Sequence, residues 1–505
     1  MVSKKTNKFL PELNQESIQR VNAVSALPSG AHIHFSGICG TGMAAVASLC
    51  KQLGFKVSGS DKAFYPPMGP FVRDLVDEVF EGYSKKNISN PDLVVIGNNL
   101  RSDNEEVLAV EQKGISFASM PEVFSALLIG DKSRAGTSVV VAGTHGKTTT
   151  SCMIGTMLEI AGKAPGYFVG GIPNSLPSNV RPVDFSRPAA ERIVVLEGDE
   201  YDSAFFAKWP KFHSYRPDIV VLTSLEFDHA DIYEGLEQVE EEFYRLSKRI
   251  PKGGYLVLHD ELKSYASLWQ NEIEAEILLY GEDPESDFVL LSRAQVEDGQ
   301  ALSFKLGKIA VEFKTSEVGL HNALNLLASA AVGELSGLSV EQIEHGLNAF
   351  VGVERRQRIV GDYSGLTLIE DFAHHPTAVR LTLDGLKERY PGRRLVAVFE
   401  PRSNTSRRHF FQEEYSKSFN SADVCFFKEV EDSAGYSATS TELVSLDVKK
   451  LCEKLGDKAK SFSEIESILE KIIQNRQDGD VLVIMSNGDF GGLLGKLTSA
   501  YDSIF

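Results

Sequence analysis

The stretch SVVVAGTHGKTTTS, residues Ser138 to Ser151, indicates how the middle of this chain folds. Its run of valines predicts a buried strand, and the glycines that follow predict a tight loop opening into a helix. Such a loop presents backbone N–H groups and a helix N-terminus to phosphate oxygens. Lys147 is expected to reach the β- and γ-phosphates of a nucleotide, and the Thr148 hydroxyl to contact Mg²⁺. Val141 stands where the common phosphate-loop pattern has its first glycine, so this loop has the shorter form GxxGK[ST].

Length and charge limit the classes of protein to which the chain can belong. At 505 residues the chain is too long for a single hydrophobic core and predicts about three domains. A net charge of −18 argues against general binding to nucleic acids or anionic membranes, because both require a basic surface. The N-terminus lacks the apolar core of a secretory signal, and no run of about 18 apolar residues occurs. We therefore expect a cytoplasmic protein with no membrane insertion.

Three α/β blocks follow one another along the sequence. Residues 1–30 are a polar extension that we expect to be mobile or loosely packed. Residues 31–135 open with a strand, a glycine turn, a helix and a second strand. Residues 136–350 carry the phosphate loop on a mostly parallel sheet, although residues 251–318 alternate as antiparallel strands do. Residues 351–505 form the third block, so the predicted fold class is α/β with three domains.

Acidic side chains follow two predicted strands of the central block. Glu197 ends the strand RIVVLE, and Glu226, Asp228 and His229 follow the strand DIVVLTS. Open parallel sheets place ligands at the carboxyl ends of their strands. Carboxylate oxygens beside a phosphate loop suit Mg²⁺, and the imidazole could complete a second metal site. The alternative for any one of these acids is a solvated loop residue.

The first block contains a glycine turn that resembles a dinucleotide fingerprint. In HFSGICGTGM the glycines Gly37, Gly40 and Gly42 give GxxGxG, whereas the usual fingerprint is GxGxxG. Asp61 ends the second strand, where an acid commonly holds a ribose hydroxyl. These features favour a nucleotide of some kind in this block.

The third block contributes histidines and an arginine at predicted strand ends. EDFAHHPTAV contains Asp371, His374 and His375, and FEPRSNT contains Arg402. The paired histidines could equally be satisfied core residues. The guanidinium of Arg402 has the geometry to bind a carboxylate, although a structural ion pair explains it as well.

Taken together, GTHGKTT, EFDHADIY, GLHNALN, ERRQR and EDFAHHPT closely resemble the Mur ligase superfamily, in this order and over nearly the whole chain. Within it, GSDKAFYPPM, EGDEYDSAFFAKWPKF, EPRSNT and VIMSNGDFGG look more like the murein peptide ligases than the ligases that add L-alanine. The murein peptide ligases join UDP-N-acetylmuramate to the tripeptide L-alanyl-γ-D-glutamyl-meso-diaminopimelate in cell-wall recycling. The alternative is the UDP-N-acetylmuramate:L-alanine ligase of de novo peptidoglycan synthesis.

The resemblance implies two Rossmann-like domains on either side of the ATP-binding domain, and it assigns residues to each ligand. The N-terminal domain would bind the UDP-sugar through Gly37, Cys39, Gly40, Thr41, Gly42, Met43, Asp61, Asn98 and Asn99. ATP would contact Gly143, Thr144, His145, Gly146, Lys147, Thr148, Thr149, Asn322, Asn325, Arg356 and Asp371. Mg²⁺, with two ions expected, would be held by Thr148, Glu197 and His229. Lys147, His229 and Arg356 would be catalytic, and the incoming peptide would meet His375, Arg402 and Asn487.

The chain departs from the superfamily pattern at one point. Several members carry a carbamylated lysine downstream of the metal histidine, but Phe243 and Tyr244 lie in that region here, with Lys248 beyond them. The branch that uses free UDP-N-acetylmuramate also lacks this lysine, so we assign Lys248 no such role.

Two other classes of protein account for part of this sequence pattern. A nicotinamide-dependent oxidoreductase is suggested by GICGTGM and Asp61, but it leaves the phosphate loop unexplained. A catalytically silent nucleotide-binding regulator would lack metal ligands, whereas Thr148, Glu197 and His229 are all present.

Overall fold

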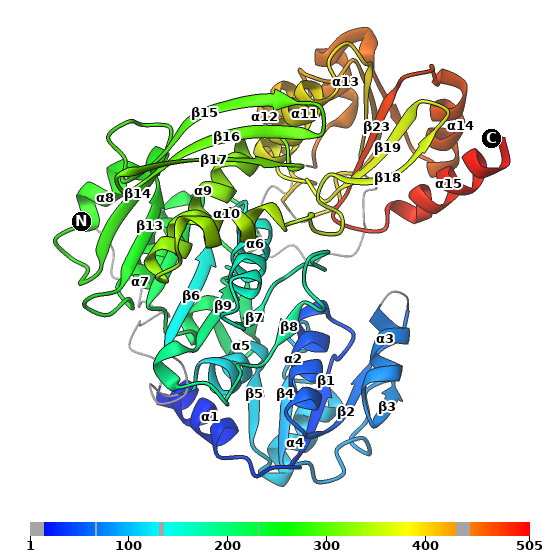
Figure 1. The fold of residues 1–505 in the computed structure, drawn as a ribbon. Helices are drawn as coiled ribbons and strands as arrows, with labels where there is room; N and C mark the ends of the chain where they lie inside the picture. Colours follow the sequence, from blue (N-terminus) through cyan, green and yellow to red (C-terminus); the bar gives the residue numbers. More distant parts are fainter. Residues whose placement is uncertain are drawn as a thin grey trace, which may run out of the picture.

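The computed structural model describes residues 15–65, 68–130, 136–230, 232–403, 405–430 and 445–504. Its large sheets have five, ten and six strands and follow one another along the sequence. Figure 1 shows an N-terminal body in blue, a central body in cyan and green, and a C-terminal body in yellow to red. The predicted three-domain α/β fold is therefore confirmed. No helix among the described residues combines the length and the apolar character needed to cross a lipid bilayer.

The N-terminal domain is built on a parallel sheet with the strand order β3-β2-β1-β4-β5. Because the order reverses between β1 and β4, the carboxyl ends of these strands form the crevice where open α/β sheets bind ligands. The strands are β1 (His32–Ser36), β2 (Lys56–Asp61), β3 (Glu78–Glu81), β4 (Leu93–Ile96) and β5 (Phe117–Ser119). The helices are α2 (Thr41–Gln52), α3 (Met68–Leu75), α4 (Glu105–Lys113) and α5 (Met120–Phe124).

Helix α1 (Gln15–Ser25) corrects the expectation that the N-terminal extension is loosely packed. The Ser17 hydroxyl donates to Glu122 Oε1 at 2.6 Å, and Arg20 Nε donates to the same oxygen at 3.0 Å. Val24 is fully buried. The helix is polar in composition, so its few apolar residues do not predict that it packs on the domain. Its polar side chains supply hydrogen-bond donors to the buried Glu122 carboxylate. Residues 1–14 of the predicted extension lie outside the described residues.

The central domain is built on a ten-stranded sheet with the order β17-β16-β15-β14-β13-β12-β6-β9-β7-β8. From β14 to β7 the neighbouring strands are parallel. Its strands are β6 (Thr137–Ala142), β7 (Gly166–Phe168), β8 (Val180–Arg181), β9 (Ile193–Glu197), β12 (Ile219–Leu222), β13 (Tyr255–His259), β14 (Glu276–Gly281), β15 (Phe288–Val296), β16 (Gly299–Leu306) and β17 (Ile309–Thr315). The helices are α6 (Lys147–Ile160), α7 (Leu236–Ser247), α8 (Lys263–Trp269), α9 (Leu320–Leu335) and α10 (Val340–Asn348), and β10 (Asp202–Ala204) pairs with β11 (Ala207–Pro210) in a separate hairpin.

The antiparallel part of the central sheet is smaller than predicted. Strands β15, β16 and β17 form antiparallel pairs, as expected from their alternating sequences. Strands β13 and β14 lie within the same predicted region, 251–318, but they pair in parallel with each other and β13 pairs in parallel with β12. The apolar run of β13 is typical of a strand in a parallel sheet covered on both faces.

The C-terminal domain contains a six-stranded sheet with the order β18-β19-β23-β20-β21-β22. Only the edge pair of β18 and β19 is antiparallel among these described strands. The strands are β18 (Arg358–Tyr363), β19 (Leu366–Asp371), β20 (Leu395–Phe399), β21 (Val424–Lys428), β22 (Ala459–Phe462) and β23 (Val481–Met485). The helices are α11 (Pro376–Arg389), α12 (Gln412–Ser418), α13 (Val448–Leu455), α14 (Ile465–Asn475) and α15 (Leu493–Ile504).

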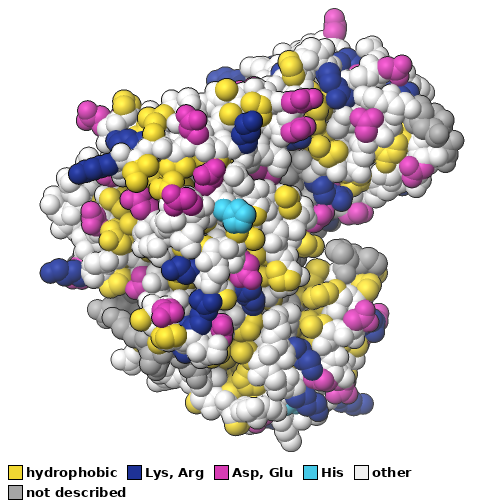
Figure 2. Space-filling model, viewed as in Figure 1, with side chains coloured by type: hydrophobic (Ala, Val, Ile, Leu, Met, Phe, Trp, Pro, Cys, Tyr) yellow, Lys and Arg dark blue, Asp and Glu magenta, His cyan; other side chains and the backbone are white. Residues whose placement is uncertain are grey.

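The C-terminal domain contacts the central domain directly (Figure 1). Arg293 on β15 forms an ion pair with Glu388 on α11, with 2.5 Å between Nη1 and Oε2. The hydroxyl of Thr377, in the first turn of α11, donates to Glu226 Oε2 at 2.7 Å. Figure 2 shows acidic and basic side chains interspersed over the visible face and a hollow between the C-terminal and N-terminal domains. The contacts bring the carboxyl ends of central and C-terminal strands to one place.

Candidate active site

A cavity of about 500 Å³ lies between the central and C-terminal domains. The segments that follow β6, β9 and β12 form one wall, and the segment between β19 and α11 forms another. The first turn of α9 closes a third side. All four strands deliver their carboxyl ends to the cavity, which is where parallel sheets place ligands.

The predicted phosphate loop, Gly143 to Thr149, lines this cavity from Thr144 onward. Gly143 has φ 125° and Gly146 has φ 81°, values that favour glycine. A Cβ atom on Gly146 would lie 2.7 Å from Asn325 Oδ1, so the loop also needs glycine for its close approach to α9. The His145 N–H donates to Ser224 Oγ at 2.8 Å, which anchors the loop to the end of β12. These features hold the loop beside the N-terminus of α6, where N–H groups have no partner within the helix.

Lys147 lies in the cavity wall and is held by acids. Its Nζ donates to Glu200 Oε1 at 3.0 Å and to the Thr144 carbonyl at 3.2 Å. Burial lowers the pKa of Lys147, but the neighbouring Glu200 and Asp199 carboxylates outweigh burial and raise it. Lys147 is therefore a permanent positive charge placed at the phosphate loop.

The predicted metal ligands form two neighbouring groups. Thr148 Oγ1 donates to Glu197 Oε1 at 3.0 Å, and the other Glu197 oxygen accepts from the Gly170 N–H at 2.6 Å. His229 Nε2 lies 2.8 Å from Glu200 Oε1, and Glu200 also pairs with Lys147. His229 has a positive φ of 55°, a value that is uncommon for a residue other than glycine, and it lines the cavity. Glu200 was not among the predicted metal ligands, although its position three residues after Glu197 places it at the same strand end.

These side chains fit a hard divalent cation. A hydroxyl, two buried carboxylates and one imidazole provide mainly oxygen donors, as Mg²⁺ prefers. A Cβ on Gly170 would lie 2.5 Å from Glu197 Oε1, so this glycine leaves room for the carboxylate. Burial raises the pKa of Glu197, although the hydrogen bonds from Gly170 and Thr148 and the charge of Lys147 oppose this rise. A cation beside Glu197 would favour the ionised carboxylate further.

The remaining predicted ATP contacts come from α9, which lies against the phosphate loop, and from the C-terminal domain. Asn322 and Asn325 sit on the first turns of α9, and Asn325 Nδ2 donates to Asn322 Oδ1 at 3.3 Å. Arg356 packs its guanidinium 4.8 Å from the centre of the Phe372 ring. Asp371 is buried and accepts backbone N–H donors from Gln357 at 2.8 Å and Ala373 at 2.7 Å. Its carboxylate therefore also fixes the two backbone segments that carry Arg356 and the histidines.

The three residues predicted for the peptide do not line one cavity, although the Arg402 side chain packs against Gly488, the neighbour of Asn487. His375 and Asn487 line the main cavity, and Asn487 Oδ1 is buried without a hydrogen-bond partner among the described residues. Arg402 instead lines a separate cavity of about 580 Å³ on the C-terminal domain, with Arg407 and Lys428. The position of Arg402 after β20 does not predict which cavity this side chain lines, because the cavity depends on how two loops pack.

The residues predicted for the UDP-sugar lie in the N-terminal domain, away from the main cavity. The turn after β1 leads into α2, and the Cys39 N–H donates to Asp61 Oδ2 at 2.8 Å. Tyr83 also donates to Asp61, with 3.3 Å between the oxygens. Gly37 and Gly40 lie in the turn after β1, Thr41, Gly42 and Met43 begin α2, and Asn98 and Asn99 are exposed after β4. They therefore surround the crevice between β1 and β4.

Several cavity residues were missed from the sequence. Ser224 binds the phosphate loop, Phe372 supports Arg356, and Thr377 joins the two domains. Ser224 could have been found, because it is the last residue of the predicted strand DIVVLTS, which precedes Glu226. Phe372 and Thr377 act through contacts between domains, which the sequence pattern does not display.

Comparison with known proteins identifies the family. Residues 32–131 match the Mur ligase family catalytic domain, residues 141–333 the Mur ligase middle domain, and residues 355–488 the Mur ligase glutamate ligase domain. The UDP-N-acetylmuramate–L-alanyl-gamma-D-glutamyl-meso-2,6-diaminoheptandioate ligase of Escherichia coli is 33% identical over 469 residues, which cover 92% of this chain and 97% of the relative.

Two further comparisons agree. The UDP-N-acetylmuramate–L-alanine ligase of Myxococcus xanthus is 32% identical over 466 residues, covering 91% of this chain and 93% of the relative. The crystal structure of a murein peptide ligase from Psychrobacter arcticus has a TM-score of 0.69 and 31% identity, covering 94% of this chain and 99% of that chain. The predicted resemblance is thus confirmed, and the chain belongs to the Mur ligase family.

Proposed function

We propose that the protein joins UDP-N-acetylmuramate to the tripeptide L-alanyl-γ-D-glutamyl-meso-diaminopimelate in an ATP-dependent reaction. As a Mur ligase, the chain is an ATP-dependent enzyme that forms amide bonds. The observation that carries the proposal is the cavity in which Lys147, Thr148, Glu197, Glu200 and His229 meet beside the C-terminal domain. The tripeptide is supported by the Escherichia coli relative and by the Psychrobacter arcticus murein peptide ligase.

The proposed reaction activates a carboxylate before the amide forms. The lactyl carboxylate of the sugar attacks the γ-phosphate of ATP, which breaks the bond to the β-phosphate oxygen and releases ADP. The α-amine of the peptide then attacks the carbonyl carbon of the acyl phosphate, and phosphate leaves with the former carboxylate oxygen. Phosphorylation is needed because a carboxylate near neutral pH has no good leaving group.

The side chains of the cavity suit the charge that this reaction gathers. Phosphoryl transfer is promoted mainly by positioning and by electrostatic stabilisation of the phosphate oxygens. Lys147 and the N–H groups of the loop supply positive charge and hydrogen bonds, and Arg356 faces them from the C-terminal domain. Thr148, Glu197 and His229 would hold the Mg²⁺, for which we propose two ions. Bound Mg²⁺ would neutralise part of the negative charge of the phosphates.

Contact between the central and C-terminal domains would protect the activated carboxylate from water. An acyl phosphate hydrolyses when wetted, so a closed cavity favours transfer to the amine. The hydrogen bond from Thr377 to Glu226 joins the two domains at the edge of the phosphate loop. We propose that His375 and Asn487 face the incoming peptide, that Arg402 acts outside the main cavity, and that the N-terminal residues around Asp61 bind the UDP-sugar. The supply of ATP favours the cytoplasm as the site of the reaction.

Transfer of an isotope label tests the proposed reaction. With ¹⁸O in both oxygens of the lactyl carboxylate, one ¹⁸O atom should appear in each phosphate released, because that oxygen leaves with the phosphorus. Mass spectrometry of the phosphate and of the amide product measures the transfer. Amide formation with unlabelled phosphate would contradict the acyl-phosphate route.

An L-alanine ligase is the second candidate function. It is favoured by the 32% identity to the Myxococcus xanthus enzyme over 91% of this chain. Both candidates share the first step and differ only in the amine that attacks.

A further inference from the structure

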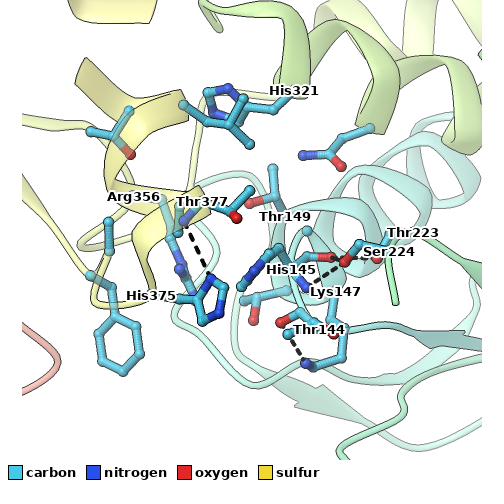
Figure 3. Close-up of a pocket in the computed structure, with 18 of the residues that line it drawn as sticks. Thr144, His145, Lys147, Thr149, Thr223, Ser224, His321, Arg356, His375 and Thr377 are labelled. Carbon is cyan, nitrogen blue, oxygen red and sulfur yellow. Dashed lines mark hydrogen bonds between the residues drawn. The ribbon is translucent and has the colours of Figure 1, made fainter. Parts of the chain in front are cut away.

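Three side chains from separate segments converge at the junction of the central and C-terminal domains. His145 belongs to the phosphate loop, Glu226 follows β12, and His375 directly precedes α11. Glu226 Oε2 lies 3.4 Å from His145 Nε2 and 3.5 Å from His375 Nδ1. One ligand atom from each of the three residues lies within 4.8 Å of the others. Figure 3 shows the rings of His145 and His375 facing one another, and their centres are 4.5 Å apart.

The hydrogen bonds of His375 determine which ring nitrogen is free to bind a cation. His375 Nε2 lies 3.3 Å from the carbonyl oxygen of Phe227, so this nitrogen carries the proton and donates it. Nδ1 accepts a long hydrogen bond of 3.3 Å from the Thr377 N–H, which shows that Nδ1 bears a lone pair. Glu226 Oε2, which is also an acceptor, lies 3.5 Å from Nδ1, and no proton is shared between the two atoms. A cation bound between them would take the Nδ1 lone pair from its long contact with the Thr377 N–H and would remove the repulsion between two acceptors.

The surroundings of the cluster resemble the outer shell of a metal site. Ligating histidines commonly donate their second ring N–H to a carbonyl or carboxylate, as His375 does to Phe227. The carboxylate is also oriented, because the Thr377 hydroxyl donates to Glu226 Oε2 at 2.7 Å. The Glu226 backbone N–H donates to Thr144 Oγ1 at 2.9 Å, which fixes the start of the side chain.

We propose that His145, Glu226 and His375 form a binding site for a transition-metal dication such as Zn²⁺, which bridges the central and C-terminal domains. Two imidazoles and one carboxylate are a donor set that Zn²⁺ accepts and that Mg²⁺ disfavours. Bond lengths of about 2.0–2.1 Å in tetrahedral geometry place ligand atoms about 3.4 Å apart. Both separations to Glu226 match this value, and a small rotation of either ring would shorten the third. The site shares no residue with the predicted Mg²⁺ ligands.

Metal titration of the full chain tests the site without any measurement of ligation. Untagged protein is stripped with a chelator and titrated with Zn²⁺ against a fluorescent competitor, with excess Mg²⁺ present to occupy oxygen-rich sites. We expect one Zn²⁺ per chain and binding at least about 10-fold weaker in Glu226→Gln and His375→Ala. Thr377→Val, which removes only the hydroxyl that orients Glu226, should also weaken binding by about 10- to 100-fold. His345→Ala removes an exposed histidine on α10 and should bind as the wild type does.

The bridging part of the proposal has its own measurement. Addition of Zn²⁺ should slow amide hydrogen exchange at the start of α11 in the wild type and leave it unchanged in Glu226→Gln. Glu226→Gln preserves the side-chain volume, so circular dichroism of this variant should match the wild type. Equal Zn²⁺ affinity in the wild type, Glu226→Gln and His375→Ala would overturn the proposal. Absence of a Zn²⁺ site in the wild type, or exchange at α11 unaffected by Zn²⁺, would overturn it as well.

Discussion

Lys147→Ala should lower kcat for amide ligation by at least about 10²- to 10³-fold, the loss typical of removing one group that stabilises transition-state charge. Lys147 is the buried cation of the phosphate loop, and the acids around it hold its pKa above the usual value. Its ammonium group is therefore charged at every pH at which the enzyme works. Phosphate release in the presence of ATP, Mg²⁺, UDP-N-acetylmuramate and tripeptide measures the loss.

The Lys147→Ala variant should still fold. Lys147 donates to the Thr144 carbonyl, but the glycines of the loop and the bonds of His145 to Ser224 and of Thr144 to Glu226 do not involve the lysine side chain and remain in the variant. Lys248→Ala is the matched control, because this exposed lysine lies over the Tyr244 ring and does not line the cavity. Circular dichroism checks both variants. Activity of folded Lys147→Ala within a few-fold of the wild type would contradict the role of Lys147.

Glu197→Gln should lower kcat by about 10²-fold or more and raise the Mg²⁺ concentration needed for half-maximal activity. The substitution keeps the size of the side chain but removes the charge that faces Thr148 Oγ1 at 3.0 Å. The amide can still accept the Gly170 N–H through its oxygen, so the local backbone should stay in place. Steady-state rates over a range of Mg²⁺ concentrations measure both effects.

Asp202→Asn is the control for Glu197→Gln. Asp202 belongs to the same acidic stretch of sequence but pairs with Lys208 on the surface, at 2.8 Å. Removing that charge should leave the rate and the Mg²⁺ dependence unchanged. An equal change of rate and of Mg²⁺ dependence in both variants would mean that the total negative charge of this stretch, and not the position of Glu197, governs the effect.

The placement of the predicted site residues of the central domain was predictable because it is encoded locally. A strand, a glycine loop and a helix follow one another without a break from Ser138 to Ser151, so spacing alone placed Lys147 and Thr148. Glu197 and His229 were predictable because each follows a strand of the same parallel sheet. Strand ends at one sheet edge must lie close together, whatever separates them in the sequence.

Contacts between distant segments were beyond the sequence pattern. Helix α1 packs through Arg20 onto Glu122, about a hundred residues away, and its polar composition gave no sign of burial. Arg402 and His375 both follow strands of one sheet, yet loop packing sends them to different cavities. The bond of Thr377 to Glu226 exists only because two domains meet.

The proposed function requires that the attacking amine belongs to the tripeptide, which a competition between nucleophiles measures. The enzyme is supplied with ATP, Mg²⁺ and UDP-N-acetylmuramate, and kcat/KM is measured with the tripeptide and with L-alanine by phosphate release and product mass. The proposed function predicts a clearly higher kcat/KM for L-alanyl-γ-D-glutamyl-meso-diaminopimelate than for L-alanine. Equal or higher kcat/KM with L-alanine would contradict it.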